Sequence, residues 1–146
     1  MPITRREICC LLPALLPIAT DLPAFAAEKE SLPSAAFEFG KLPVEKSNGA
    51  EFRSIMKGKL ATGESVEVHE TLLPPNGFPH PPHHHEHSEM WLIREGTVQI
   101  TITGTPHVLG PGGLGFVRSN EEHGIRNVGT TVANYYVVAI GPGADT

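Results

Sequence analysis

Alternating polar and apolar residues mark two stretches of the chain as β-strands with one buried face. Residues 64–72, ESVEVHETL, alternate along most of their length. Residues 97–103, TVQITIT, place Val98, Ile100 and Ile102 on one side and polar residues on the other. Because successive side chains of a strand point to opposite faces, both patterns predict strands that cover an apolar core.

Other stretches are apolar throughout. Residues 90–93, MWLI, and 135–140, YYVVAI, contain no charged side chain. Such runs predict strands that are buried on both faces, or that line a barrel whose outer side meets another subunit. Residues 114–117, LGFV, give a further strand signal, whereas residues 41–59 give no clear prediction.

Turn-forming residues separate these strands. They stand at residues 74–77 (PPNG), 95–96 (EG), 104–106 (GTP), 110–113 (GPGG) and 128–130 (VGT). No window of helical length has a convincing helical period. The pattern predicts an all-β fold, an antiparallel sandwich or barrel, and the 15 glycines and 14 prolines agree with many tight turns.

Length and composition narrow the class of protein. A chain of 146 residues makes one domain, and 40% hydrophobic with 18% charged residues is typical of a globular protein. The net charge is −5 and no basic stripe is present, which argues against nucleic-acid binding.

The first 26 residues have the layout of a secretory signal peptide. Two arginines at residues 5–6 precede a short apolar run at residues 9–19, and residues 24–26, AFA, offer the small side chains that a signal peptidase needs. The paired arginines resemble a twin-arginine signal. The run is too short, and too rich in proline, to span a membrane. We therefore expect export to the periplasm or the medium, without stable membrane insertion.

Cleavage after residue 26 leaves a flexible lead-in over residues 27–36 and a domain over residues 37–146. The only two cysteines, Cys9 and Cys10, lie within the predicted signal. The exported protein would then have no disulfide and no thiolate chemistry.

Five of the eight histidines lie between residues 80 and 87. His83 and His85 are two residues apart, so on an extended segment both rings point to one side and can bind one ion. Glu89 follows four residues later, and a bend after His85 brings its carboxylate to the same ion. Imidazoles with one carboxylate form a site that first-row divalent metals accept. His123, after the strand signal at residues 114–117, is the candidate for a fourth ligand.

This spacing resembles the first motif of the cupins. That motif is Gly, five residues, His-x-His, three or four residues, Glu, six residues, Gly. The chain matches it at every fixed position, which are Gly77, His83, His85, Glu89 and Gly96.

The second cupin motif is matched at its ends. It is Gly, five residues, Pro-x-Gly, two residues, His, three residues, Asn, and the chain has Gly112, His123 and Asn127 in register. Arg118 replaces the proline and Asn120 replaces the middle glycine. Asparagine tolerates a left-handed backbone, so we expect the turn to persist.

The resemblance covers about residues 37–140 and implies a cupin-type antiparallel β-barrel, also called a jelly roll or double-stranded β-helix. It implies one divalent metal ion, with the ligands His83, His85, Glu89 and His123. It also implies structural roles in turns for Gly77, Gly96 and Asn127.

Other readings of the histidines stay open. A solvated histidine-rich loop is the alternative to a metal site. A register with His85 and His87 fits less well, because Trp91 or Ile93 would stand at the carboxylate position. His84 is expected to face away. The remaining histidines have no partner at useful spacing and are expected on the surface or in a pocket; they are His69, His80 and His107.

Three imidazoles and one carboxylate leave positions open on a five- or six-coordinate ion, which favours chemistry or ligand binding over a structural metal. Cupins with this ligand set include dioxygenases acting on phenolic or enolic substrates. The resemblance therefore favours an oxidoreductase of the dioxygenase type with a small organic substrate. Two alternatives are a non-redox metal-dependent isomerase or lyase, and a non-catalytic cupin that binds a sugar or another small molecule.

Residues near the motifs are candidates for the remaining roles. Trp91 lies two residues after Glu89 and should share its inward face, and Phe116 is a second candidate for the wall of a substrate pocket. The candidates for acid–base chemistry are His87, Glu122 and Arg118.

Manganese or iron is the favoured metal. A twin-arginine signal carries folded proteins, which would load metal in the cytosol before meeting tighter-binding copper or zinc. Zinc, nickel and copper also suit the donor set. Cupins commonly form dimers, and the apolar run at residues 135–140 fits a strand covered on both sides, so we expect a homodimer.

Overall fold

The structure is a computed structural model that describes residues 31–146. The predicted signal peptide and residues 27–30 of the predicted lead-in lie outside the described residues and stay predictions. Within residues 31–36, the backbone N–H of Leu32 donates to the carbonyl of Lys59, at the end of the second strand of the fold, at 2.7 Å.

The described residues fold mainly into β-strands. In residues 31–146 a single 3-10 turn, η1 (Phe39–Lys41), precedes nine strands. The strands are β1 (Glu45–Ser47), β2 (Ala50–Lys59), β3 (Ser65–Leu73), β4 (Ser88–Glu95), β5 (Val98–Ile102), β6 (Thr105–Leu109), β7 (Leu114–Val117), β8 (His123–Asn127) and β9 (Ala133–Ile140). No helix in this part of the chain is long and apolar enough to cross a membrane. The prediction of an all-β fold is confirmed.

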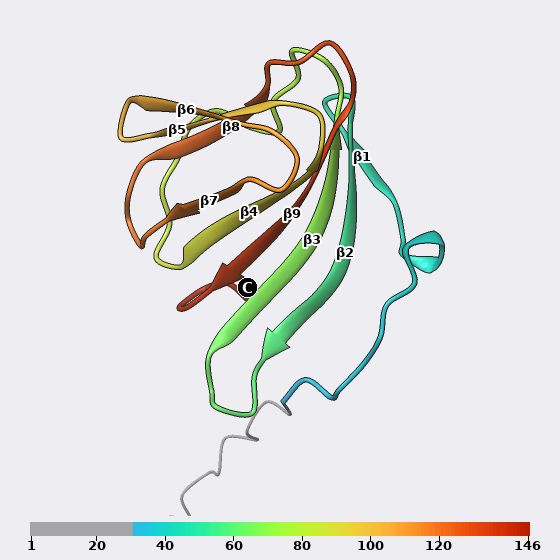
Figure 1. Ribbon diagram of the computed structural model, residues 1–146. Helices are drawn as coiled ribbons and strands as arrows, with labels where there is room; N and C mark the ends of the chain where they lie inside the picture. The colour runs from blue at the N-terminus through green and yellow to red at the C-terminus, as the bar shows by residue number, and fades with distance from the viewer. Residues whose placement is uncertain (1–30) are drawn as a thin grey trace, which may run out of the picture.

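The strands form two antiparallel sheets. The larger has the order β1-β2-β3-β9-β4-β7, and the smaller has the order β6-β5-β8. Figure 1 shows the smaller sheet beside β4 and β7, while β9, β3 and β2 continue the larger sheet away from it. This is a jelly-roll barrel, as the sequence predicts.

The core lies between the two sheets and follows the predicted alternation. Val98 and Ile100 of β5 are 0% and 1% exposed, and Ile102 packs against the same cluster. Trp91 and Ile93 of β4 meet them from the larger sheet. Burial of large apolar side chains of this kind is the main force that holds such a domain together, at about 25 cal/mol per Å² of apolar surface.

Strand β3 presents its polar side to the interior. Glu67, His69 and Thr71 line a cavity between the sheets. Val68 and Leu72, on the alternate positions, therefore face outward. Over residues 67–72 the inward positions are therefore polar, and the outward positions are apolar except for the buried Glu70.

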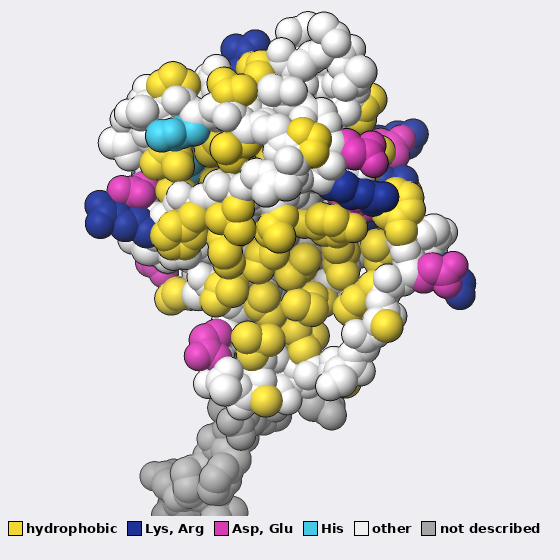
Figure 2. Space-filling view, viewed as in Figure 1, with side chains coloured by type: hydrophobic (Ala, Val, Ile, Leu, Met, Phe, Trp, Pro, Cys, Tyr) yellow, Lys and Arg dark blue, Asp and Glu magenta, His cyan; other side chains and the backbone are white. Residues whose placement is uncertain are grey.

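The outward side of the larger sheet is correspondingly apolar, and we call it the outer apolar face. Cross-strand pairing arranges its members in two rows, with Val68, Val138, Met90 and Phe116 in one and Tyr136, Leu92 and Leu114 in the other. Leu92, Leu114 and Phe116 are 41%, 56% and 53% exposed. Figure 2 shows hydrophobic side chains gathered over the face that carries β4, β9 and β3.

The prediction that Phe116 lines the substrate pocket is wrong. In β7 the side chains alternate, so that Gly115 and Val117 are buried while Leu114 and Phe116 are exposed. Val117 takes the inward position opposite Glu89 of β4. The phenyl ring of Phe116 consequently lies on the outer apolar face.

Backbone geometry explains several motif residues. Gly96 has φ +79°, and a Cβ there would lie 2.6 Å from the Cα of Ala133. At Gly77 a Cβ would lie 2.9 Å from the carbonyl oxygen of Pro74, which accepts a hydrogen bond from the Gly77 N–H. Asn120 has φ +62°, so it adopts the left-handed backbone expected where the motif has glycine.

Candidate metal centre

A backbone pairing between two distant segments builds the site. His83 lies in the extended segment before β4, and His123 is the first residue of β8. The N–H of each donates to the carbonyl of the other, at 3.0 Å and 2.8 Å, in an isolated antiparallel bridge. The two side chains are thereby placed next to each other, with ring centroids 4.7 Å apart.

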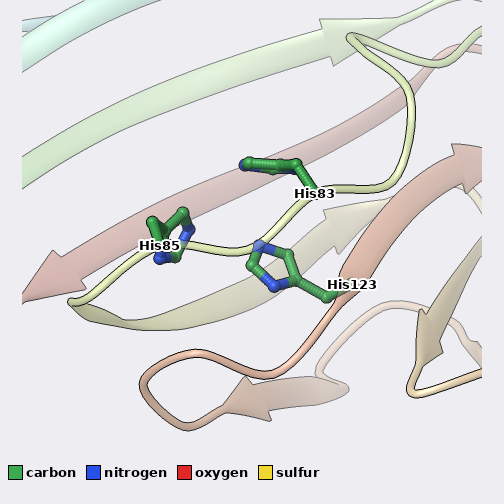
Figure 3. A group of neighbouring side chains, drawn as sticks. All are labelled: His83, His85 and His123. Atoms are coloured by element: carbon green, nitrogen blue, oxygen red, sulfur yellow. The ribbon is translucent and has the colours of Figure 1, made fainter.

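His85 joins them from the same extended segment. His83 and His85 are partly buried while His84 between them is exposed, so the segment alternates as a strand does. Figure 3 shows the rings of His83, His85 and His123 gathered from these two segments. One ring nitrogen of each lies within 4.8 Å of the others.

Glu89 of β4 lies next to two of the three rings. Its Oε2 is 2.8 Å from Nε2 of His85 and 3.7 Å from Nε2 of His123. The structure thus brings together all four residues that the sequence predicts as ligands.

Backbone carbonyls fix the protons on two of the rings. Nδ1 of His85 lies 2.9 Å from the carbonyl oxygen of His87, and Nδ1 of His123 lies 2.8 Å from that of Glu121. A carbonyl oxygen only accepts, so each Nδ1 carries a proton and each neutral ring turns the lone pair of Nε2 toward Glu89. Two lone pairs that face a carboxylate repel it unless a proton or a cation lies between them. One divalent ion can bind Nε2 of His85, Nε2 of His123 and the carboxylate of Glu89 at the same time.

Two ring nitrogens of the cluster also lack a hydrogen-bond partner. Nδ1 of His83 and Nε2 of His123 are buried and unpartnered within the described residues. Buried polar atoms are nearly always paired in native proteins. Orphaned nitrogens in a group of three imidazoles and a carboxylate fit a metal ion, and the donor set suits a first-row divalent metal.

The electrostatics of the cluster favour a neutral His83 and an ionised Glu89; burial would lower the pKa of His123, but its contact with Glu89 outweighs burial and raises that pKa. Burial lowers the pKa of His83 to about 4, and the nearby imidazoles of His80, His123 and His85 add to the effect. Burial would raise the pKa of Glu89, but His123 and His85 outweigh it and lower that pKa. A neutral imidazole and an ionised carboxylate are the forms that bind metal.

His87 lies closer to the cluster than its spacing suggests. Its ring stacks on that of His85, with centroids 3.5 Å apart and an interplanar angle of 17°. His85, His87 and Glu89 form a second group whose ligand atoms lie within 4.8 Å of one another. The bend at residues 86–87 brings the carboxylate of Glu89 to His85 and His87. The expectation that a site with these two histidines would have Trp91 or Ile93 in place of a carboxylate is therefore wrong.

The structure does not bring Arg118 and Glu122 to the cavity, and their acid–base roles stay predictions. Both side chains are exposed in the connection between β7 and β8, and neither lines the cavity. Arg118 pairs instead with Glu121, with Nε 2.9 Å from Oε1. The motif places these residues next to His123 in sequence, but their side chains point to the surface.

A cavity of about 250 Å³ opens beside the cluster. Trp91 is 2% exposed and its ring centroid lies 5.4 Å from that of His123, so it forms a wall of the cavity next to the clustered histidines. Tyr135, Val137 and Ala139 of β9 line the cavity too. Burial raises the pKa of Tyr135, whose hydroxyl therefore stays protonated at neutral pH.

The wall formed by β3 was not singled out by the sequence. Cross-strand pairing aligns Glu67 with Ala139 and Glu89, and aligns His69 with Val137 and Trp91. The available signal was three polar side chains, Glu67, His69 and Thr71, at alternate positions of one strand. Alternation shows that they share a face but not that this face is the inner one.

A larger groove of about 480 Å³ lies over β5 and β8 on the outside of the smaller sheet. The groove is lined mainly by apolar and uncharged groups, and Arg126 is its charged side chain. His80 lines both this groove and the smaller cavity beside the clustered histidines. The ligand cluster lines the smaller cavity, which we therefore treat as the functional site.

The chain matches the Cupin domain family over residues 69–139, a segment that contains the four clustered residues. Similar solved structures include an RmlC-like cupin from Shewanella frigidimarina NCIMB 400, with 19% identity over 77% of this chain and 96% of that chain, and a TM-score of 0.63. A predicted oxalate decarboxylase from Thermotoga maritima has 20% identity over 73% and 98%, with a TM-score of 0.62. The polyketide cyclase RemF from Streptomyces resistomycificus has 20% identity over 74% and 80%, with a TM-score of 0.61. At these identities the likeness shows the fold alone.

One curated protein also shares part of the sequence. The HTH-type transcriptional activator RhaS of Klebsiella pneumoniae (strain 342) is 33% identical over 61 residues, which are 42% of this chain and 21% of that protein. The match spans about a fifth of the activator, so it concerns one segment and not the whole of that protein.

Proposed function

This chain belongs to the cupin superfamily, and from that premise we propose that it is a metal-dependent enzyme of the dioxygenase type that acts on a small organic substrate. The observation that carries the proposal is the arrangement of Nε2 of His85 and His123 around Glu89, next to a cavity. Three imidazoles and one carboxylate leave coordination positions for a ligand, unlike a closed structural site. An iron or manganese ion held there would supply Lewis acidity and redox chemistry with dioxygen.

The cavity limits the substrate. A volume of about 250 Å³ is smaller than the sites that bind drug-sized ligands, at roughly 300–1,000 Å³. Trp91 and Tyr135 offer flat apolar contacts, while the ligand cluster and β3 offer polar ones. These features support a small phenolic or enolic compound, whose oxygen atoms face the cluster and whose carbon skeleton lies against the aromatic rings.

We expect the metal-loaded protein to consume dioxygen when a suitable small phenol, catechol or enol is added. With iron or manganese bound, the rate should exceed that of the chelator-treated protein by at least about 100-fold. An oxygen electrode measures uptake, and mass spectrometry with labelled dioxygen shows whether both oxygen atoms enter the product. Absence of oxygen uptake across such compounds, with metal bound, would contradict the dioxygenase assignment.

The second candidate is a non-redox isomerase or lyase. It is favoured by the pair of Glu67 and His69 on β3, which can move a proton within the cavity. Solved relatives with different names, a predicted oxalate decarboxylase and a polyketide cyclase, agree with a fold that hosts several chemistries. Solvent deuterium incorporation into a compound without oxygen uptake would support this candidate. Binding without either change would leave a small-molecule-binding cupin.

We further propose that the protein is a homodimer joined through the outer apolar face. Contiguous exposed apolar surface of this kind marks interaction sites in soluble proteins. A two-fold pair would cover Leu92, Leu114 and Phe116 at the same time, and would give the run at residues 135–140 the cover on both sides that its sequence predicts.

Sedimentation analysis is expected to give twice the mass of one chain. The Phe116→Glu variant should sediment as a monomer, because two carboxylates would meet in the apolar contact. Val108→Glu, at a residue that is 62% exposed on β6, is the matched control and should stay dimeric. A monomeric wild-type protein at micromolar concentration would contradict the proposal.

A further inference from the structure

Glu67 and His69 form a hydrogen-bonded pair on the inner side of β3. Nδ1 of His69 lies 2.8 Å from Oε1 and 3.1 Å from Oε2 of Glu67, and the two side chains are 24% and 22% exposed. Phe52 of β2 packs edge-on against the imidazole, with centroids 6.2 Å apart and an interplanar angle of 62°. The ring is therefore held by a carboxylate on one side and an aromatic ring on another.

This contact determines which nitrogen of His69 can accept a proton. An ionised carboxylate only accepts hydrogen bonds, so Nδ1 carries the proton that Glu67 receives. In the neutral ring Nε2 is then an unprotonated acceptor. If Nε2 takes a second proton, the imidazolium stays paired with Glu67, which stabilises the charge in a partly buried place.

The pair of Glu67 and His69 faces the candidate metal ligands across the cavity that both groups line. Glu67 and Glu89 lie on one cross-strand row with Ala139 between them, and His69 and Trp91 lie on the next row with Val137 between them. Neighbouring strands are about 4.8 Å apart, so the backbones of β3 and β4 are about 10 Å apart. The small side chains of Val137 and Ala139 leave the intervening space to the cavity, which both groups line.

Burying polar side chains without a purpose is unfavourable, and β3 has Val66, Val68 and Leu72 available for an apolar inner side. The strand instead turns Glu67, His69 and Thr71 inward. Thr71 is 1% exposed and lies beside Tyr135, its cross-strand partner on β9, so its hydroxyl adds to the polar character of this wall.

We infer that His69 is the proton acceptor of the cavity and that Glu67 positions it, so that the substrate is a small molecule with an acidic hydroxyl. As the hydroxyl oxygen binds at the cluster, its O–H bond breaks. The proton passes to Nε2 of His69, and the electron pair remains on the substrate oxygen, whose negative charge a cation held by His83, His85, Glu89 and His123 would stabilise. Phenols, catechols and enols have such hydroxyls. This inference rests on the proposed function, since it requires a cation at the cluster.

The test uses 4-nitrocatechol, whose visible absorption differs among its neutral, singly and doubly ionised forms. Zinc-loaded protein is suitable because Zn²⁺ has no redox chemistry, so the absorption reports the protonation state of the bound catechol. Glu67→Gln removes the negative charge that pairs with the imidazolium, and His69→Asn removes the proton acceptor, while both keep side chains of similar size. His107→Asn, at an exposed residue of β6, is the matched control. Zinc content is measured for every protein.

The wild type and His107→Asn should bind the catechol in a more ionised form than the free compound has at the same mildly acidic pH. Glu67→Gln and His69→Asn should bind it about tenfold more weakly or in a more protonated form, with zinc content unchanged. Unchanged affinity and absorption in both variants would overturn the role of the pair and leave the proposed function standing. Loss of zinc from both variants would also overturn it, since the pair would then hold the site together. A zinc-loaded wild type that does not bind the catechol would remove the proposed function, and the inference with it.

Discussion

Replacing His123 with alanine is expected to lower the affinity for a divalent metal ion by at least about 100-fold. His123 is 2% exposed, and no other group in the described chain hydrogen-bonds its Nε2. The carbonyl of Glu121 accepts a hydrogen bond from Nδ1–H, so the ring meets the cluster already oriented. Without this ring, the site keeps three donors, from His83, His85 and Glu89. It loses the donor that β8 supplies.

His84→Ala is the matched control, because His84 lies between two proposed ligands in sequence while its side chain is exposed. Titration calorimetry with zinc or manganese measures the affinity, and elemental mass spectrometry measures the metal retained on purification. Metal that binds only the folded state raises the melting temperature. The wild type and His84→Ala should therefore melt higher with metal, and His123→Ala should not. An equal loss in His84→Ala would favour a solvated histidine-rich loop over a defined site.

The parts of the site that are close in sequence were the most predictable. His83 and His85 belong to one extended segment, and Glu89 follows after one bend, so spacing alone indicates that their side chains meet. His123 is different, because it reaches the cluster through backbone pairing with His83. No periodicity in the sequence contains that pairing, and only the resemblance to the second cupin motif pointed to it.

Strand orientation was the part that the sequence left open. Residues 64–72 alternate, which predicts β3, but alternation does not say which side faces the core. The usual rule would turn Val68 and Leu72 to the core, whereas the structure turns Glu67 and His69 to the cavity between the sheets. Departures of this kind are expected at functional sites, where a polar interior is useful and the apolar side can be covered by a partner.

The same limit explains the error at Phe116. A four-residue apolar stretch has two possible registers, and a shift by one residue exchanges its inner and outer sides. Pairing of Val117 with Glu89 selects the register that turns Phe116 outward. Residues 41–59 gave no clear prediction because β2 mixes charged and apolar residues and contains a register shift between Ser54 and Met56.

Substitution of Asn127 is expected to destabilise the fold more than most substitutions outside the candidate metal site. Its side chain is fully buried and makes three hydrogen bonds to the backbone. Nδ2 donates to the carbonyls of Leu73 and Thr131 at 2.9 Å and 2.7 Å, and Oδ1 accepts from the N–H of Gly129 at 2.8 Å. These bonds tie the end of β3 to the turn that follows β8, so one amide joins the two sheets.

Asn127→Ala removes all three bonds and takes the amide donor from the carbonyls of Leu73 and Thr131, while the Gly129 N–H keeps only its bond to the carbonyl of Thr97. Each buried group that loses its partner costs about 1–3 kcal/mol, so the free energy of unfolding should fall by about 3–5 kcal/mol, a large part of the roughly 5–15 kcal/mol that a domain has. Denaturant titration of the metal-free protein measures this. Gln99→Ala is the control, because Gln99 donates only one long bond of 3.3 Å to Thr101 Oγ1 on the surface of β5, and it should lose less than about 1 kcal/mol. A loss of similar size in both variants would mean that the amide of Asn127 does not join the sheets. Folded Asn127→Ala should still bind metal, since the pairing of His83 with His123 lies at the other end of β8 and does not use the amide.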